Sequence, residues 1–290
     1  MDETVQAEGL PGAPVHKKRP RWSMILILFV AWLVTLMPFL FWKATWFGNR
    51  LSDAQLAGYL SDKRNPRHSQ HALVQVSDRL ARGDRSVVQF YPQLVALADS
   101  PVVELRMTAA WVMGQDNNYD PFHSALLKLV GDQDPLVRWN AALALVRFND
   151  ASGRPALREI LRPFTVVAPA SGVFKERLKP GDTVNRGTMM ARITVPSGGE
   201  LVEMRSPIPG QITRQLVANG SGLSAGTPVF VLSPNEKQVW EALRALYLIG
   251  VPSDLPDIQP FTHPMTHMSG RIQQQAQLTV EAIQKRGAAN

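Results

Sequence analysis

Residues 134–146 read DPLVRWNAALALV. Asp134 followed by Pro135 predicts the start of a helix, because an acidic side chain caps the first free amides and proline suits the first helical position. Ala141 and Ala142 are small enough to let a neighbouring helix approach closely, and the bulky residues around them can fill the seam. The stretch therefore predicts a helix that packs among other helices.

A second stretch repeats this pattern earlier in the chain. Residues 104–114 read ELRMTAAWVMG, and aligning Arg106 with Arg138 superimposes the alanine pairs. The same alignment predicts that Trp111 fills a seam between helices. Residues 119–130 lie between the two stretches and carry apolar side chains at helical spacing, so the unit is helix, turn, helix, with a period of about 32 residues.

These units resemble the HEAT family in its short, PBS-lyase-type form. The stretch from Asp134 matches the pattern D-P-x-V-R-x-x-A-A-x-A-L, residues 100–114 match it more loosely, and a weaker copy fits residues 66–80. The resemblance implies stacked helix pairs and a role in protein–protein scaffolding. We expect Arg106 and Arg138 to make hydrogen bonds between neighbouring repeats. The alternative is an ordinary helical bundle.

The helical pattern stops at residue 163, and residues 163–234 are rich in Gly, Pro, Val and Thr with period-two runs, which predicts strands. This segment contains its own repeat. Gly172 matches Gly210, and Gly187 matches Gly226. Glycines at such places favour tight turns between short strands, where the backbone often adopts a positive φ.

The two halves resemble the biotinyl/lipoyl-like barrel and the lipoyl domain of HlyD-type membrane fusion proteins. In carrier members a modified lysine stands in the turn that joins the halves. Here that turn lacks lysine, since its residues are Val195, Pro196, Ser197, Gly198 and Gly199. Lys175 and Lys179 lie in the first half, away from the turn. We therefore expect no bound biotin or lipoate, and no cofactor of any kind.

Helical periodicity returns after residue 234. Residues 236–249 read EKQVWEALRALYLI and restore the pattern of a second helix, and residues 235–287 are predicted to continue the HEAT-like repeats that begin in residues 50–162. We interpret residues 163–234 as an insertion within one helical repeat, so that residues 152–162 pack against residues 236–249. The alternative is two independent domains in tandem followed by a terminal helical hairpin.

The N-terminal segment differs from the rest of the chain. Residues 1–21 lack a periodic pattern and are predicted to be a disordered cytoplasmic tail, and residues 22–43 are predicted to form a transmembrane helix because residues 22–42 carry no charge. Basic residues before this run favour a cytoplasmic N-terminus. We therefore expect a single-pass protein of a bacterial-type inner membrane, with its bulk periplasmic. The alternative is a cleaved signal peptide.

The sequence offers few candidates for catalytic or metal-binding residues. The chain has no cysteine, which excludes disulfides, cysteine nucleophiles and thiolate metal sites. His263 and His267 are spaced for a metal pair only if they lie on a helix, and no third ligand stands near. His68 and His71 are predicted to lie on a helix surface. Four aspartates at turns are interpreted as helix caps rather than catalytic groups: Asp116, Asp120, Asp132 and Asp134.

Together these patterns predict a multidomain α + β chain, with one transmembrane helix, an α-solenoid of HEAT-like helix pairs and an inserted all-β lipoyl-like barrel sandwich. The formal net charge of +7 is mild for 290 residues, and aromatics interleaved with basic residues are missing, so nucleic acid is not an expected partner. We predict a membrane-anchored, non-catalytic scaffold or adaptor that binds proteins in a membrane transport or envelope complex. The alternative is a periplasmic enzyme or an accessory subunit of a membrane enzyme complex.

Overall fold

The computed structural model describes residues 21–44, 50–196, 199–265 and 267–289. The chain divides into two compact units, residues 1–50 and residues 51–290, which are described separately below. Residues 1–20 of the predicted tail, and Ser197 and Gly198 of the predicted joining turn, lie outside the described residues.

The first unit contains helix α1 (Arg21–Ala44). A bilayer crossing needs about 20 mostly apolar residues in one helix. Within the described ranges, no helix has the combination of length and apolar character that a membrane crossing requires. This finding contradicts the predicted transmembrane helix and, with it, the predicted inner-membrane localisation.

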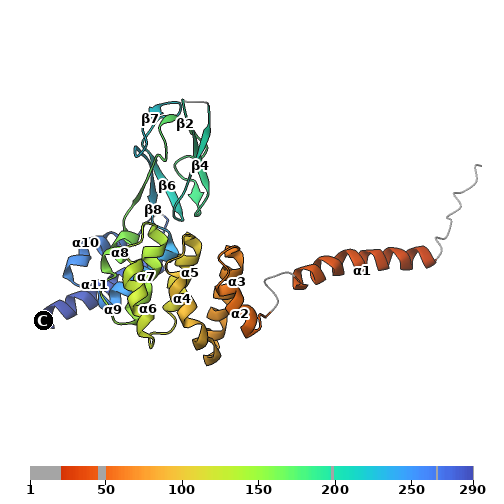
Figure 1. Cartoon of the computed structure of the whole chain (residues 1–290). Coiled ribbons are helices and arrows are strands. Elements are labelled where there is room, and N and C mark those ends of the chain that lie inside the picture. The colour runs from red at the N-terminus through yellow and green to blue at the C-terminus, as the bar shows by residue number, and fades with distance from the viewer. Residues whose placement is uncertain (1–20, 45–49, 197–198, 266, 290) are drawn as a thin grey trace, which may run out of the picture. The chain divides into compact units, whose positions relative to one another are not determined.

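The second unit contains five successive helix pairs (Figure 1). The first helices of the pairs are α2 (Asp53–Leu60), α4 (Tyr91–Leu97), α6 (Asp120–Leu129), α8 (Arg154–Leu161) and α10 (Leu255–Ile258). The second helices are α3 (Pro66–Ala81), α5 (Val103–Met113), α7 (Pro135–Arg147), α9 (Glu236–Ile249) and α11 (Gly270–Ala289). Short 3₁₀ turns complete the connections: η1 (Arg85–Phe90), η2 (Pro252–Asp254) and η3 (Gln259–Thr262).

Capping explains why α7 begins where it does. Asp134 is the N-cap residue, and its Oδ1 accepts a hydrogen bond of 2.9 Å from the amide of Leu136. Pro135 occupies the first helical position, where its missing N–H costs nothing. In α3 the arrangement is the same, because the side chain of Asn65 accepts from the amide of Arg67 and Pro66 follows it. The helix start expected from Asp134 followed by proline is thus formed by local chemistry.

Eight strands between α8 and α9 form two antiparallel sheets. The strands are β1 (Phe164–Val167), β2 (Gly172–Glu176), β3 (Thr183–Val184), β4 (Met189–Thr194), β5 (Leu201–Arg205), β6 (Gly210–Gln215), β7 (Gly222–Leu223) and β8 (Pro228–Ser233). One sheet has the order β1-β8-β6-β3 and the other β5-β4-β2-β7. The four strands of the first half, β1 to β4, correspond to β5 to β8 of the second half. Exchanging each strand for its counterpart turns one strand order into the other, so the two halves interleave.

These small open sheets contradict the fold class predicted from the sequence, which specified a lipoyl-like barrel. The sheets have free edges at β1 and β3 and at β5 and β7, and they do not close into a barrel. The internal repeat is nevertheless visible in the backbone, since Gly187 and Gly226 both have a φ near +80°. Repeated glycine turns make two interleaved halves, but they do not make a closed barrel.

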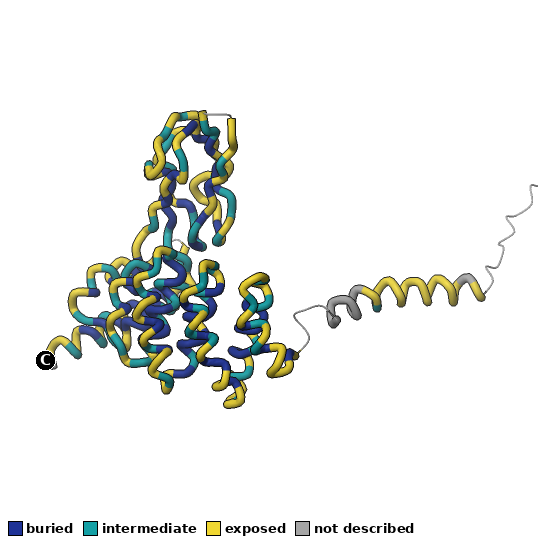
Figure 2. Tube along the Cα trace, viewed as in Figure 1, coloured by how far each residue is buried: buried dark blue, intermediate teal, exposed yellow. Residues whose placement is uncertain are grey.

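Two hydrophobic cores fill the second unit. One core lies within the helices from α2 to α7, and it includes Leu73, Tyr91 and Leu145. The other joins the later helices to the β strands, as the run of buried positions from the helices into the sheets in Figure 2 shows. Helices α8 and α9 pack against each other in this second core, although the strands separate them in the sequence.

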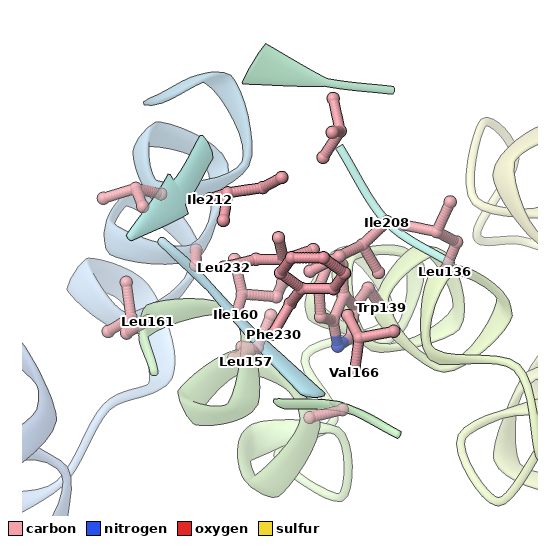
Figure 3. Close-up of a cluster of buried hydrophobic side chains, with 14 of the residues drawn as sticks. Leu136, Trp139, Leu157, Ile160, Leu161, Val166, Ile208, Ile212, Phe230 and Leu232 are labelled. Carbon is pink, nitrogen blue, oxygen red and sulfur yellow. The ribbon is translucent and has the colours of Figure 1, made fainter. Parts of the chain in front are cut away.

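Figure 3 shows where the strands and helices meet in the second core. Leu136 and Trp139 of α7 and Ile160 of α8 cluster there with Ile208 and Phe230 of the β region, and all five side chains are buried. Because the sheets and the helices share one apolar core, the β region is packed onto the array. The contact between α8 and α9 is the one that the insertion hypothesis requires, while the predicted segment boundaries stay predictions.

Candidate interaction groove

A groove of about 1400 Å³ runs along the second helices of the five pairs. Side chains of α3, α5, α7, α9 and α11 line it, and each of these helices packs on the next. Asn185 and Pro209, from loops of the β region, also line the groove. The stacking of the second helices therefore produces one continuous surface to which residues far apart in the sequence contribute.

Large apolar side chains stand exposed in this groove. Trp111 of α5 is 51% exposed and Leu248 of α9 is 61% exposed. Tyr247 of α9 and Leu278 of α11 are exposed beside them. Exposed tryptophan and tyrosine in a concave site are typical of residues that dominate binding energy in protein interfaces. The sequence alignment predicted that Trp111 fills a seam between helices, and this prediction is wrong.

The charged residues of the groove are few and of both signs. Asp78 of α3 and Lys237 of α9 both line the groove. Lys237 forms no ion pair with any of the described residues. Glu241 and Arg244 of α9 form a long pair at 3.9 Å. Arg147 donates a hydrogen bond of 3.0 Å to the carbonyl oxygen of Gly114. The groove is thus mainly an apolar and amide-lined surface with a polar rim.

Arginines between repeats hold the helices that shape the groove. Arg106 donates two hydrogen bonds to the carboxylate of Asp132, at 2.7 and 2.9 Å, and a third to the carbonyl oxygen of Ser100. Arg138 pairs with Glu159 of α8 and also donates to the carbonyl oxygen of Asp132. The expected hydrogen bonds between repeats are confirmed at both arginines.

These contacts shift the ionisation of the groups involved. Burial acts to raise the pKa of Asp132, but hydrogen bonds from Arg106 and from the amide of Asp134 outweigh it and leave that pKa below its usual value. The hydrogen bonds to Asp132 raise the pKa of Arg106. Both groups therefore stay charged at neutral pH and act as a structural pair.

The other turn aspartates are placed in different ways. Asp116 is buried and accepts hydrogen bonds of 2.7 Å from the Tyr91 hydroxyl and 2.6 Å from Arg85. Burial acts to raise the pKa of Asp116, yet these hydrogen bonds hold it below its ordinary value, while burial raises the pKa of Tyr91. Asp120 lies exposed in the first turn of α6. Asp134 caps α7, as predicted.

The β region is attached at one rim of the groove by Arg186. Its Nη1 lies 2.6 Å from Asp134 Oδ2 and its Nη2 lies 3.3 Å from Glu104 Oε1. Burial acts to lower the pKa of Arg186, but the hydrogen bond to Asp134 outweighs it and the pKa is raised. This arginine therefore ties the loop before β4 to the N-terminal ends of α5 and α7.

The remaining candidate residues lie away from the groove. In the joining turn, the amide of Val195 donates a hydrogen bond of 2.9 Å to the carbonyl oxygen of Glu200, and Pro196 is exposed. His263 has an extended backbone, so it is not presented on a helix with His267. No group of three or more potential metal ligands occurs in the described ranges. That these residues bind neither a metal nor a cofactor stays a prediction.

Reasoning from the sequence did not identify the exposed groove residues. Leu246 and Leu248 lie in one apolar run of α9, yet the first is buried and the second is exposed. The signal was the run itself: residues 245–249 read ALYLI, and an amphipathic helix buries only one stripe of such a run. The apolar residues of this run that lie outside the buried stripe are therefore candidates for a binding surface.

Comparison with protein families supports the helical part of this description. Residues 91–167, about a quarter of the chain, match the family model described as HEAT repeats. HEAT-like repeats are therefore present in the helical region, and they are consistent with a helical scaffold that has protein partners. The search of curated proteins gave no match.

Two solved structures show only local likeness. The apo structure of the ectoine utilization protein EutE (DoeB) from Ruegeria pomeroyi is 22% identical, with a TM-score of 0.23, over 24% of this chain and 22% of that chain. A single-chain, multi-domain long-chain acyl-CoA carboxylase is 15% identical, with a TM-score of 0.24, over 34% of this chain and 10% of that one. The matched parts thus cover less than a quarter of either of those chains.

Proposed function

We propose that the chain is a non-catalytic scaffold that binds a segment of a partner protein in the groove along α3, α5, α7, α9 and α11. The exposed apolar set in that groove carries the proposal: Trp111, Tyr247, Leu248 and Leu278. A protein that keeps a tryptophan half exposed in a concave surface leaves a free energy of burial available to a partner. The HEAT-like repeats support a scaffold of this kind.

Spacing between the helices sets the size of the bound segment. Neighbouring packed helices lie about 8–10 Å apart, so Trp111 on α5 and Tyr247 on α9, with α7 between them, are about 16–20 Å apart. A bound helix rises about 1.5 Å per residue, so its two apolar anchors would be about 11–13 residues apart. The partner segment is therefore an amphipathic helix of about three turns or more.

The absence of catalysis is part of the proposal and rests on the carboxylates. Asp132 is engaged by Arg106, and Asp116 by Tyr91 and Arg85. Asp134 both caps α7 and accepts from Arg186. Each of these carboxylates is engaged by structural hydrogen bonds or ion pairs, which leaves it poorly placed to exchange protons with a substrate.

Site-specific photo-crosslinking tests the proposal. A photoreactive amino acid at Gln238, which lines the groove, should capture a partner that the same amino acid at Ser124, an exposed position of α6 outside the groove, does not capture. The captured partner, once purified, should lose about 2 kcal/mol of binding free energy, roughly 30-fold in affinity, on Trp111→Ala.

Leucine substitutions provide a matched control. Leu248→Ala in the groove should weaken the purified partner's binding, and Leu127→Ala, which shortens another exposed leucine on α6, outside the groove, should not. Equal crosslinking from Gln238 and Ser124, or unchanged affinity in both Trp111→Ala and Leu248→Ala, would contradict a groove-bound partner.

A further inference from the structure

We infer that one face of the β region is a second interaction surface, which binds an acidic protein segment that also carries apolar side chains. This surface, here called the cationic face, consists of the outward-pointing residues of β2, β4 and β5: Val173, Lys175, Arg192, Thr194, Leu201, Glu203 and Arg205. It is separate from the groove, since none of these residues lines it.

Alternation along the strands defines this face. In β2, Gly172 and Phe174 are buried while Val173 and Lys175 are exposed. In β4, Ile193 is buried and Arg192 is exposed. Because successive side chains of a strand point to opposite sides of the sheet, the exposed residues share one side and the buried ones form the core.

The central feature of the cationic face is a pair of like charges. Lys175 of β2 lies directly opposite Arg192 of β4 in the antiparallel register. Residues in such positions have Cβ atoms about 5 Å apart, and like charges there destabilise a sheet. Neither side chain forms an ion pair with any residue that the structure describes.

The nearest carboxylate on the face is already engaged. Glu203 of β5 lies opposite Arg192 on its other side, but its carboxylate pairs with Arg205 of its own strand. The face therefore carries three cations and one anion, and the two cations in its middle form no ion pair within the described part of the chain. A bound carboxylate would relieve this repulsion, which is the charge complementarity that selects an acidic partner.

An apolar row runs beside the charges. Val173 and Leu201 are exposed, and the register places both beside Thr194, on either side of it. This row is two residues along the strands from the cationic row, a distance of about 7 Å. A polyanion such as a nucleic acid would neutralise the cations but would leave the apolar row uncovered. A protein segment with acidic and apolar side chains about 7 Å apart covers both.

Peptide binding to the full-length chain tests the inference. The probe is a fluorescent synthetic peptide of repeating Glu-Ser-Val-Ser, which presents glutamate and valine alternately on one side of an extended chain. Fluorescence anisotropy should show binding that weakens as salt is added. A Lys-Ser-Val-Ser peptide should not bind, and a Glu-Ser-Ser-Ser peptide should bind at least about tenfold more weakly because it lacks apolar groups.

Charge reversal identifies the residues. The double substitution Lys175→Glu with Arg192→Glu should reduce binding of the Glu-Ser-Val-Ser peptide by at least about tenfold. The matched control, Lys179→Glu with Arg214→Glu, changes the net charge equally at exposed positions outside β4 and β5 and the outward side of β2, and should alter binding less than about twofold. Val173→Ser should weaken binding without any change of charge.

Three results would overturn the inference. The first is equal loss of peptide binding in both charge-reversed proteins, which would mean that peptide binding depends only on the net charge of the protein. The second is unchanged binding in Lys175→Glu with Arg192→Glu. The third is tighter binding of a single-stranded oligonucleotide than of the peptide, with that oligonucleotide binding lost in Lys175→Glu with Arg192→Glu. Lys175→Gln with Arg192→Gln removes the two positive charges, and with them their repulsion, without adding negative charges. This variant replaces the charge-reversed protein in the binding measurement if charge reversal impairs folding.

Discussion

The guanidinium of Arg186 lies 2.6 Å from the carboxylate of Asp134 and links the β region to the start of α7. Asp134 is the N-cap of that helix at the same time. One carboxylate therefore stabilises a helix end and fixes a loop that is 52 residues away in the sequence. The position of the β region at the groove rim depends on this pair together with the shared apolar core.

Arg186→Ala should loosen the β region without unfolding the helices. The substitution removes a part-buried, charge-assisted pair, and we expect a loss of about 1–2 kcal/mol in the free energy of unfolding. Limited proteolysis should cleave the connections near residues 163 and 235 faster than in the unchanged protein. Arg214→Ala, an exposed arginine on β6, is the control and should show no acceleration.

Arg106→Lys should destabilise the array almost as much as Arg106→Ala. Arg106 and Asp132 form a mostly buried two-point contact, and lysine cannot supply its geometry. Breaking a buried pair by removing one partner costs about 3–5 kcal/mol, which urea unfolding would detect. Arg205→Ala, at an exposed pair on β5, should change the unfolding free energy by less than about 1 kcal/mol. A small effect at Arg106 would mean that apolar stacking alone holds the repeats.

Two leucines of α9 separate stability from binding. Leu246 is fully buried, so Leu246→Asp should cost about 3 kcal/mol or more because it places an unpaired charge in the core. Leu248 is exposed in the groove, so Leu248→Asp should leave the unfolding free energy within about 0.5 kcal/mol and abolish binding of a groove partner. Thermal melts and binding measured on both variants check this. Equal destabilisation would show that Leu248 is part of the core.

The sequence predicts the local parts of this structure well and the distant parts poorly. The aligned Arg106 and Arg138 indicate the helix pairs because the same sequence pattern recurs about 32 residues further along the chain. The repeated Gly187 and Gly226 indicate the paired turns for the same reason. The contact of Arg186 with Asp134 has no periodic signal, so no pattern in the sequence could reveal it.

Exposure is the property that the sequence predicts least. Trp111 and Leu143 are equivalent in the repeat alignment, but Trp111 is half exposed and Leu143 is packed against the core. His71 was expected on a surface, yet it is buried. The depth of a side chain depends on which neighbouring helix covers it, and a helical period alone does not contain that information.

Burial gives His71 a direct influence on stability. The amide nitrogen of Gln75 lies 3.0 Å from His71 Nε2, and the oxygen of the same amide accepts a hydrogen bond of 2.8 Å from the backbone of Leu51. The amide is thus oriented to donate to the imidazole, which must be neutral at Nε2 to accept. Burial, and then the charge of His68, lower the pKa of His71.

Acid should therefore destabilise the N-terminal repeats through His71. A group whose pKa is lowered on folding contributes stability that is present above its unfolded pKa, about 6.5 for histidine, and is lost as the pH falls through the folded value. We expect the melting temperature to fall by a few degrees from neutral pH to mildly acidic pH, since 1 kcal/mol corresponds to about 2–4 °C in a unit of this size. His71→Gln keeps a polar acceptor beside Gln75 without the titration and should reduce this fall, whereas His263→Gln, at an exposed histidine, should leave it unchanged. Calorimetric melts at the two pH values decide the matter: an equal fall in the unchanged protein and in His71→Gln would assign the acid sensitivity to other groups.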